Sequence, residues 1–176
     1  MTVQLVRPTA DLLDSWAAAV AEFGEGHVDG SGLTAPVTPD RATLDALIAD
    51  AERLADTSIA PPADRVHNDL YWVVDGAEVV GFLSFRHALN DWLAEAGGHI
   101  GYSVRSSRRR QGIVSAALAL GLERAREIGL QRVLITCDVD NEGSYRTIER
   151  ACGVLQDISD QSERGMGLLR RYWIAL

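Results

Sequence analysis

The stretch that most constrains the fold is Val104-Arg-Ser-Ser-Arg-Arg-Arg-Gln-Gly-Ile-Val-Ser-Ala-Ala-Leu118. It joins residues 99–104, typical of a β-strand, to residues 112–128, whose apolar side chains recur at helical spacing. Gly112 permits a tight turn, and the first turn of the following helix has backbone N–H groups without intrahelical partners. These N–H groups and the helix dipole favour an anion, and four arginines within residues 105–110 add fork-shaped cationic donors. The stretch predicts a site for a pyrophosphate group.

Two common phosphate-binding motifs do not account for this loop. It lacks the Gly-Lys-Ser/Thr of a Walker loop, and it lacks the three-glycine spacing of a dinucleotide fingerprint. An arginine-rich segment is often only a solvated surface loop, and a glycine often only breaks a helix. The combination of strand, arginines, glycine and helix favours the binding site over these simpler interpretations.

The composition is that of a soluble globular protein. The 176 residues are 47% hydrophobic and 24% charged, which favours a single domain over residues 1–176. No apolar run approaches the ~18–20 residues needed to span a membrane. The N-terminal residues lack the basic and apolar regions of a signal peptide. The two cysteines make neither a disulfide framework nor a zinc site, so we expect a cytoplasmic protein without a metal.

The charge balance restricts the partners. The formal net charge is −8, which argues against nucleic acid as the main partner even though all 17 basic residues are arginines. Acidic residues are frequent within residues 11–55, which favours a cationic small molecule as partner. A solvated acidic face explains the same residues equally well.

The rest of the chain predicts alternating strands and helices. Strands are expected at residues 3–6, 70–74, 78–86, 99–104, 131–137 and 167–174, and helices at residues 11–23, 40–55, 112–128 and 141–151. Asp75-Gly76 is typical of a hairpin turn, and Asp40 is a good N-cap for the second helix. This order predicts a mixed α/β domain of the α+β type with the sheet at its centre.

Residues 104–114, followed by a helix, a strand and Asp138-Val-Asp-Asn141, resemble the acetyl-CoA-binding core of the GNAT N-acetyltransferases. The loop of that family has Arg or Gln, two residues, Gly, one residue, then Gly or Ala. Arg109 and Gly112 fit this pattern, and Val114 departs from it. The resemblance covers about residues 70–153. It implies a central mixed sheet flanked by helices, with acceptor-side helices at about residues 10–56.

The resemblance also implies a reaction, the acetyl-CoA-dependent transfer of an acetyl group to a primary amine by direct attack in a ternary complex. We expect the amine to belong to a small molecule, and a homodimer is compatible with the resemblance. The residues implied to bind acetyl-CoA are Val104, Arg109, Arg110, Gln111, Gly112, Ile113, Val114, Ser115 and Asn141. The alternative is a non-catalytic acyl-CoA-binding regulatory module, which Val114 and a missing tyrosine would suit.

The catalytic candidates are His99 and Glu95. His99 occupies the strand position where relatives often have a glutamate suspected as base, and it titrates in a useful range. It is either the base or a histidine that only packs. Glu95 is the alternative base, or a solvated loop carboxylate. Many relatives have an acid tyrosine seven residues after the helix-opening asparagine. That position is Ile148 here, and Tyr145 lies about 60° away around the helix, so the acid role is not transferred to it.

Strand alternation gives an expectation for the direction of His99. His99, Gly101 and Ser103 share one face of the predicted strand, and the apolar residues between them share the other face. We expect the apolar set to face the core and the His99 face to meet the cleft where the thioester and the amine converge.

Overall fold

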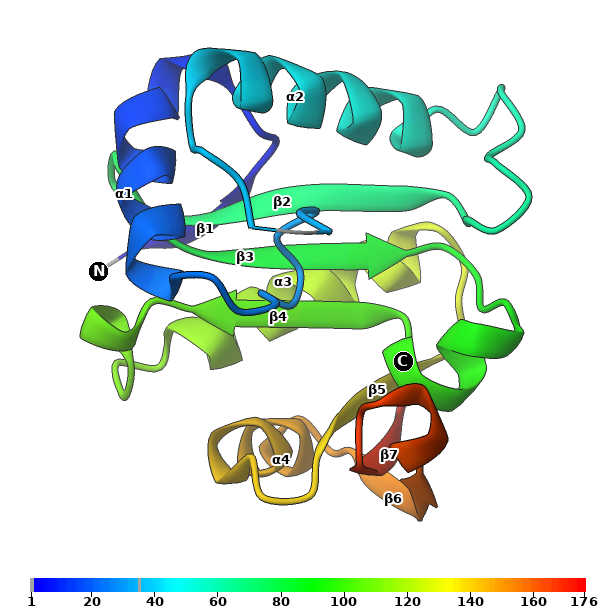
Figure 1. The fold of residues 1–176 in the computed structure, drawn as a ribbon. Helices are drawn as coiled ribbons and strands as arrows, with labels where there is room; N and C mark the ends of the chain where they lie inside the picture. The colour runs from blue at the N-terminus through cyan, green and yellow to red at the C-terminus, as the bar shows by residue number, and fades with distance from the viewer. Residues whose placement is uncertain (1, 35) are drawn as a thin grey trace.

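The computed structural model describes residues 2–34 and 36–176 (Figure 1). The N-terminal half contains β1 (Val3–Val6), η1 (Ala10–Leu12), α1 (Leu13–Phe23), α2 (Arg41–Ala55), β2 (Asn68–Asp75) and β3 (Glu78–Arg86). The C-terminal half contains η2 (Leu93–Gly97), β4 (Ile100–Val104), η3 (Ser106–Arg108), α3 (Ile113–Glu127), β5 (Arg132–Asp138), α4 (Glu142–Arg150), β6 (Val154–Asp160), η4 (Ser162–Arg164) and β7 (Leu168–Ala175). Among residues 2–34 and 36–176, no helix has the length and apolar character needed to cross a bilayer.

The described strands form two antiparallel sheets, with strand orders β1-β2-β3-β4 and β5-β7-β6. Helices α1 and α2 cover one face of the first sheet, and α3 lies on its other side (Figure 1). The predicted N-cap is present, because the side chain of Asp40 accepts the N–H of Thr43 at 2.8 Å. The mixed α/β class with flanking helices, predicted from the sequence, is confirmed, whereas two antiparallel sheets stand in place of the single central mixed sheet that the resemblance implied.

Two apolar clusters hold the layers together. One lies between α1, α2 and the first sheet and includes Trp16, Leu44, Trp72 and Phe82. The other lies beneath α3 and joins the two sheets, and its buried members include Leu83, Phe85, Ile113, Leu118, Ile135 and Tyr172. Burial of such side chains is worth about 1.5–3 kcal/mol each, so these clusters fix the positions of β4, β5 and α3 relative to one another.

Strand β6 was not predicted from the sequence. This strand lies at an edge of the second sheet and leaves Val154, Leu155 and Ile158 exposed, and among the described strands it pairs only with β7. Because few of its side chains are buried, it lacks the alternation of apolar and polar residues that marks a half-buried strand. The segment 87–98, for which the sequence predicted neither a strand nor a helix, also contains the wide helical turn η2.

Candidate active site

The start of α3 has the geometry that the sequence predicted for an anion site. Gly112 is the N-cap of α3 and has φ +77°. Arg110, two residues earlier, has φ +62°. Regular helical bonding begins where the N–H of Ala116 donates to the carbonyl of Gly112 at 3.1 Å. Within the described residues, the N–H groups of residues 111–115 have no hydrogen-bond partner. These groups, at the positive end of a 15-residue helix, are available to phosphate oxygens.

The arginine cluster divides into two pairs. The side chains of Arg105 and Arg108 face the protein: Nε of Arg105 lies 2.7 Å from Oε2 of Glu22, and Arg108 lies 2.6 Å from Asp75. Both arginines also contact Glu78. Arg109 and Arg110 are exposed and make no ion pair within the described residues. The prediction of one four-arginine cluster was therefore too coarse, because two arginines anchor the loop and two remain available to a ligand.

Glu22 of α1 anchors the other side of this loop. Its carboxylate accepts hydrogen bonds from the N–H of Ser107 at 2.8 Å and from the hydroxyls of Ser106 and Ser107 at 2.9 Å. The backbone N–H of Ser107, together with Arg105, lowers the pKa of Glu22 to about 2. Glu22 is therefore ionised at neutral pH, and it holds the loop that precedes α3 against the first helix.

Strands β4 and β5 touch at one end and are not paired along their lengths. The N–H of His99 donates to the carbonyl of Leu134 at 2.7 Å, and β4 and β5 belong to different sheets. On the other edge of β4, the backbone N–H of Arg86 donates to the carbonyl of His99, and the backbone N–H of Arg105 donates to the carbonyl of Val80. Backbone groups of an antiparallel strand alternate between its two edges. The N–H groups of Ile100, Tyr102 and Val104 therefore point toward β5, where none of the described strands pairs with them.

The imidazole of His99 closes one end of this gap. Its Nδ1 accepts the N–H of Leu134 at 2.9 Å, so its neutral form carries the proton on Nε2. The ring is buried, with 5% of the residue exposed, and it packs edge-on against Trp173. Burial and the nearby Arg86 guanidinium lower the pKa of His99 to about 4. Since its free lone pair is already used, the geometry favours the packing alternative over the base.

Substitution of His99 separates these alternatives. In His99→Asn the amide oxygen replaces Nδ1 as the acceptor for Leu134, so we expect kcat/KM to stay within about 5-fold of wild type. In His99→Ala the buried N–H of Leu134 loses its partner, and we expect a loss of about 1–3 kcal/mol in the free energy of unfolding. Kinetics and urea titration measure both. A 100-fold loss of turnover in His99→Asn would restore the histidine as base.

The other predicted catalytic residue, Glu95, lies on η2. Its carboxylate contacts Arg171 of β7 at 3.0 Å, and 43% of its side chain is exposed. Arg171 also binds the carboxylate of Asp157 through two nitrogens at 2.7 and 2.6 Å. Glu95 thus joins η2 to the second sheet and keeps an edge of its carboxylate open to solvent.

The remaining predicted ligand-binding residues surround the gap and the start of α3. Asn141 caps α4, where its side-chain oxygen accepts the N–H of Ser144 at 3.1 Å. Ile113 is buried in the core, so only its backbone can face a ligand. Val114 and Val104 are half-buried, and Ser115 and Gln111 are exposed at the surface beside them.

Tyr102 is a residue of this region that sequence reasoning did not single out. Its hydroxyl lies 2.9 Å from the hydroxyl of Ser144, so it connects β4 to α4 beside the gap. Burial raises the pKa of Tyr102, and burial raises the pKa of the nearby Cys137 thiol to about 11. The Tyr102 hydroxyl and the Cys137 thiol are therefore protonated and uncharged at pH 7. The sequence signalled only that Tyr102 belongs to the core face of its strand.

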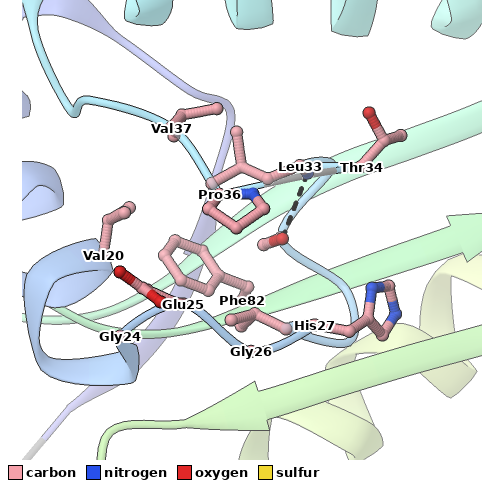
Figure 2. Close-up of a pocket in the computed structure, with 12 residues that line it drawn as sticks. Val20, Gly24, Glu25, Gly26, His27, Leu33, Thr34, Pro36, Val37 and Phe82 are labelled. Atoms are coloured by element: carbon pink, nitrogen blue, oxygen red, sulfur yellow. Dashed lines mark hydrogen bonds between the residues drawn. The ribbon is translucent and has the colours of Figure 1, made fainter.

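A small recess lies on the face covered by α1 and α2 (Figure 2). It is bounded by Val20 at the end of α1, by Phe82 of β3, and by the connection between α1 and α2, which contributes Leu33 and Val37. Within it, the hydroxyl of Ser31 accepts the N–H of Leu33 at 3.1 Å. The lining is mainly apolar, and it belongs to the half of the chain expected on the acceptor side.

Free donors at the start of α3 and an unpaired strand edge are the features expected of a protein that binds an extended ligand with a phosphate end, as coenzyme A thioesters have. A family model described as the acetyltransferase (GNAT) family matches residues 41–154. The chain therefore belongs to this family: it is an acetyltransferase, and its cosubstrate is acetyl-CoA. No curated protein matches the sequence significantly.

Solved structures of several acetyltransferases have the same fold. The microcin C7 self-immunity acetyltransferase MccE, solved with acetyl-CoA and AMP, is 16% identical, has a TM-score of 0.71, and covers 99% of this chain and 92% of its own. A Salmonella typhimurium enzyme that modifies the N-terminal serine of ribosomal protein L7/L12 is 22% identical, with a TM-score of 0.70. The match covers 100% of this chain and 96% of that enzyme. Mycobacterium smegmatis RimJ, solved with CoA-disulfide, is 20% identical, with a TM-score of 0.72. The match covers 98% of this chain and 81% of RimJ. At these identities the likeness concerns the fold.

Proposed function

We propose that this chain acetylates the primary amine of a small molecule by direct attack within a ternary complex. The observation that carries the proposal is the continuity of free donors, from the N–H groups of residues 111–115 to the unpaired edge of β4. A protein N-terminus is the second candidate acceptor, because the L7/L12-modifying relative acts on one. The smaller acceptor is favoured because the connection between α1 and α2 lies directly on β4: the hydroxyl of Ser103 donates to the carbonyl of Asp29 at 2.8 Å.

In the proposed mechanism, acetyl-CoA supplies an activated thioester. Arg109, Arg110 and the N–H groups of residues 111–115 hold its pyrophosphate, with Asn141 contributing from the start of α4. N–H groups of the β4 edge, at Ile100 and Tyr102, donate to the thioester carbonyl and stabilise the oxyanion that develops there. The protein thereby fixes the thioester carbon in a position that an amine can reach, which is chiefly catalysis by proximity.

The proton steps follow from the side chains that remain available. The neutral amine nitrogen attacks the carbonyl carbon, the C–S bond breaks, and the sulfur leaves as a thiolate. We propose that Glu95, with its open carboxylate edge, accepts the amine proton through water. The proton that the thiolate needs comes from solvent, because Ile148 replaces the acid tyrosine that many relatives have.

The proposal is tested by incubating the protein with acetyl-CoA and a panel of small amines, and by following free thiol release and the mass of the products. An N-acetyl product formed at a rate that depends on enzyme concentration supports it. Tight binding of acetyl-CoA without turnover of any amine, or of any N-terminal peptide, would instead support the regulatory module.

The role of Tyr145 gives a separate prediction. The guanidinium carbon of Arg170 lies 4.6 Å from the centroid of the Tyr145 ring. Tyr145 thus packs on an arginine, and the helix position of the acid tyrosine in many relatives is occupied by Ile148. We therefore expect Tyr145→Phe, which keeps the ring and removes only the hydroxyl, to retain most of the turnover. Steady-state kinetics with a saturating acceptor measure this. A loss of about 100-fold, the size expected for a missing general acid, would assign the acid role to Tyr145.

A further inference from the structure

Arg86 ends β3 on the face of the sheet that α1 and α2 cover. Its side chain reaches across to β4, because a Cβ placed on Gly101 would lie 3.6 and 3.7 Å from its two terminal nitrogens. The same point lies 3.4 Å from the backbone nitrogen of Gly30, in the connection between α1 and α2. The guanidinium is therefore held between β4 and the connection that covers it, on the acceptor side of the strand that borders the gap.

The charge of Arg86 is not matched by the protein. Its Nη1 donates to the carbonyls of Gly97 and Gly98 at 2.8 and 3.1 Å, which uses one of its three nitrogens. Among the described residues, Nε and Nη2 have no hydrogen-bond partner, no carboxylate forms an ion pair with Arg86, and neither nitrogen is sealed from solvent. Burial lowers the pKa of Arg86, and the nearby Arg65 lowers it further.

Most other partly buried arginines of the chain differ from Arg86 in this respect; the exception is Arg170, whose Nε donates to the carbonyl of Val139 and whose guanidinium lies over the ring of Tyr145. Arg105, Arg108, Arg124 and Arg171 each contact a carboxylate within 3.0 Å. The carboxylate that acts most on Arg86 is Asp29, which is exposed and lies 3.3 Å from the imidazole of His27. A largely buried cation without a paired anion is unfavourable in isolation. Its retention beside the reacting strand is explained if a ligand supplies the anion.

We propose that Arg86 binds a carboxylate of the acceptor, so that the substrate is a small amine that also carries a carboxylate, such as an amino acid. The inference rests on the proposed transferase function and narrows it. The planar guanidinium presents Nε and Nη2 on one edge, which matches the two oxygens of a carboxylate. The overall charge of the chain favoured a purely cationic acceptor. The positive charge of Arg86 favours instead an acceptor that carries both an amine and a carboxylate.

The test uses binding, so that it does not depend on turnover. The full chain, saturated with coenzyme A, is titrated by calorimetry with the proteinogenic amino acids and with the carboxamide of each. We expect at least one amino acid to bind, its carboxamide to bind about 10- to 100-fold more weakly, and Arg86→Gln to remove that difference. Arg86→Lys, which keeps the charge without the fork, should retain part of it. Arg65→Gln is the matched control, since Arg65 contacts Asp50 at 3.6 Å, and it should preserve the preference.

The outcomes separate this inference from the function on which it rests. Equal binding of acids and carboxamides, or no binding of any amino acid, overturns the inference, and acetylation of other amines would leave the transferase function intact. A carboxylate preference that disappears in Arg86→Gln supports the inference even if no acetyl product forms, in which case the proposed transfer fails instead. Circular dichroism melts of each variant verify that a lost preference is not lost folding.

Discussion

Gly112→Asp is expected to weaken acetyl-CoA binding at least ~100-fold. No atom lies within 4 Å of a Cβ built on Gly112, and aspartate tolerates the left-handed backbone better than most residues, so the fold should accept the change. The new carboxylate would lie among the free N–H groups that the pyrophosphate needs. Like charges about 4 Å apart near a protein surface repel by roughly 4 kcal/mol, more than the ~2.7 kcal/mol that a 100-fold change requires.

Gly112→Asn is the matched control for this prediction. Asparagine has nearly the same size and the same tolerance of φ +77°, but it is neutral. Calorimetric titration with acetyl-CoA should therefore show a much smaller loss for Gly112→Asn than for Gly112→Asp. Equal losses would mean that bulk and backbone strain, and not charge, govern this position. Wild-type affinity in both variants would remove the start of α3 from the binding site.

Asp69→Ala is expected to lower the free energy of unfolding by about 2–4 kcal/mol. Its carboxylate is 1% exposed and lies 2.7 Å from Arg7, 2.8 Å from Arg124 and 3.1 Å from His87. The substitution leaves the guanidinium groups of Arg7 and Arg124 without their shared anion. Because Arg7 and Arg124 are partly exposed, they can turn toward water, which keeps the cost below that of a fully buried pair. Urea titration at pH 7 measures the loss.

The same carboxylate has a pH signature. Its cationic and hydrogen-bonding partners hold the pKa of Asp69 well below its ordinary value, despite burial. A lowered carboxyl pKa stabilises the fold above the ordinary value near 4, and this contribution is lost as the pH falls below it. The acid limb of the stability profile should therefore be shallower in Asp69→Ala. Asp45→Ala, which removes an exposed pair with Arg41, should cost under about 0.5 kcal/mol, and a comparable loss in both variants would contradict the account.

The sequence was most informative where structure is local. A glycine, an arginine-rich loop and a helix start lie within a few residues of one another, so their geometry at Gly112 could be predicted without knowing the rest of the fold. The hairpin turn at Asp75-Gly76 and the N-cap at Asp40 followed for the same reason. The family resemblance then extended these local features to the order of most of the elements.

What the sequence did not reveal depends on contacts between distant segments. The separation of Arg105 and Arg108 from Arg109 and Arg110 depends on acidic residues up to 83 positions away in the chain. Strand alternation correctly placed Ile100, Tyr102 and Val104 against the core, whereas His99 lies just before β4 and is itself buried. The alternation contained no information on the N–H of Leu134, which occupies Nδ1 of His99. Likewise, nothing near Arg86 in the sequence indicated that this guanidinium would lack an anionic partner.

The most direct test of the central claim is a crystal structure of the chain with acetyl-CoA. The account predicts the pyrophosphate on the N–H groups of residues 111–115, the pantetheine arm along the open edge of β4, and the thioester near Ile100 and Tyr102. A complex in which acetyl-CoA lies elsewhere, with β4 and β5 paired along their lengths, would contradict it.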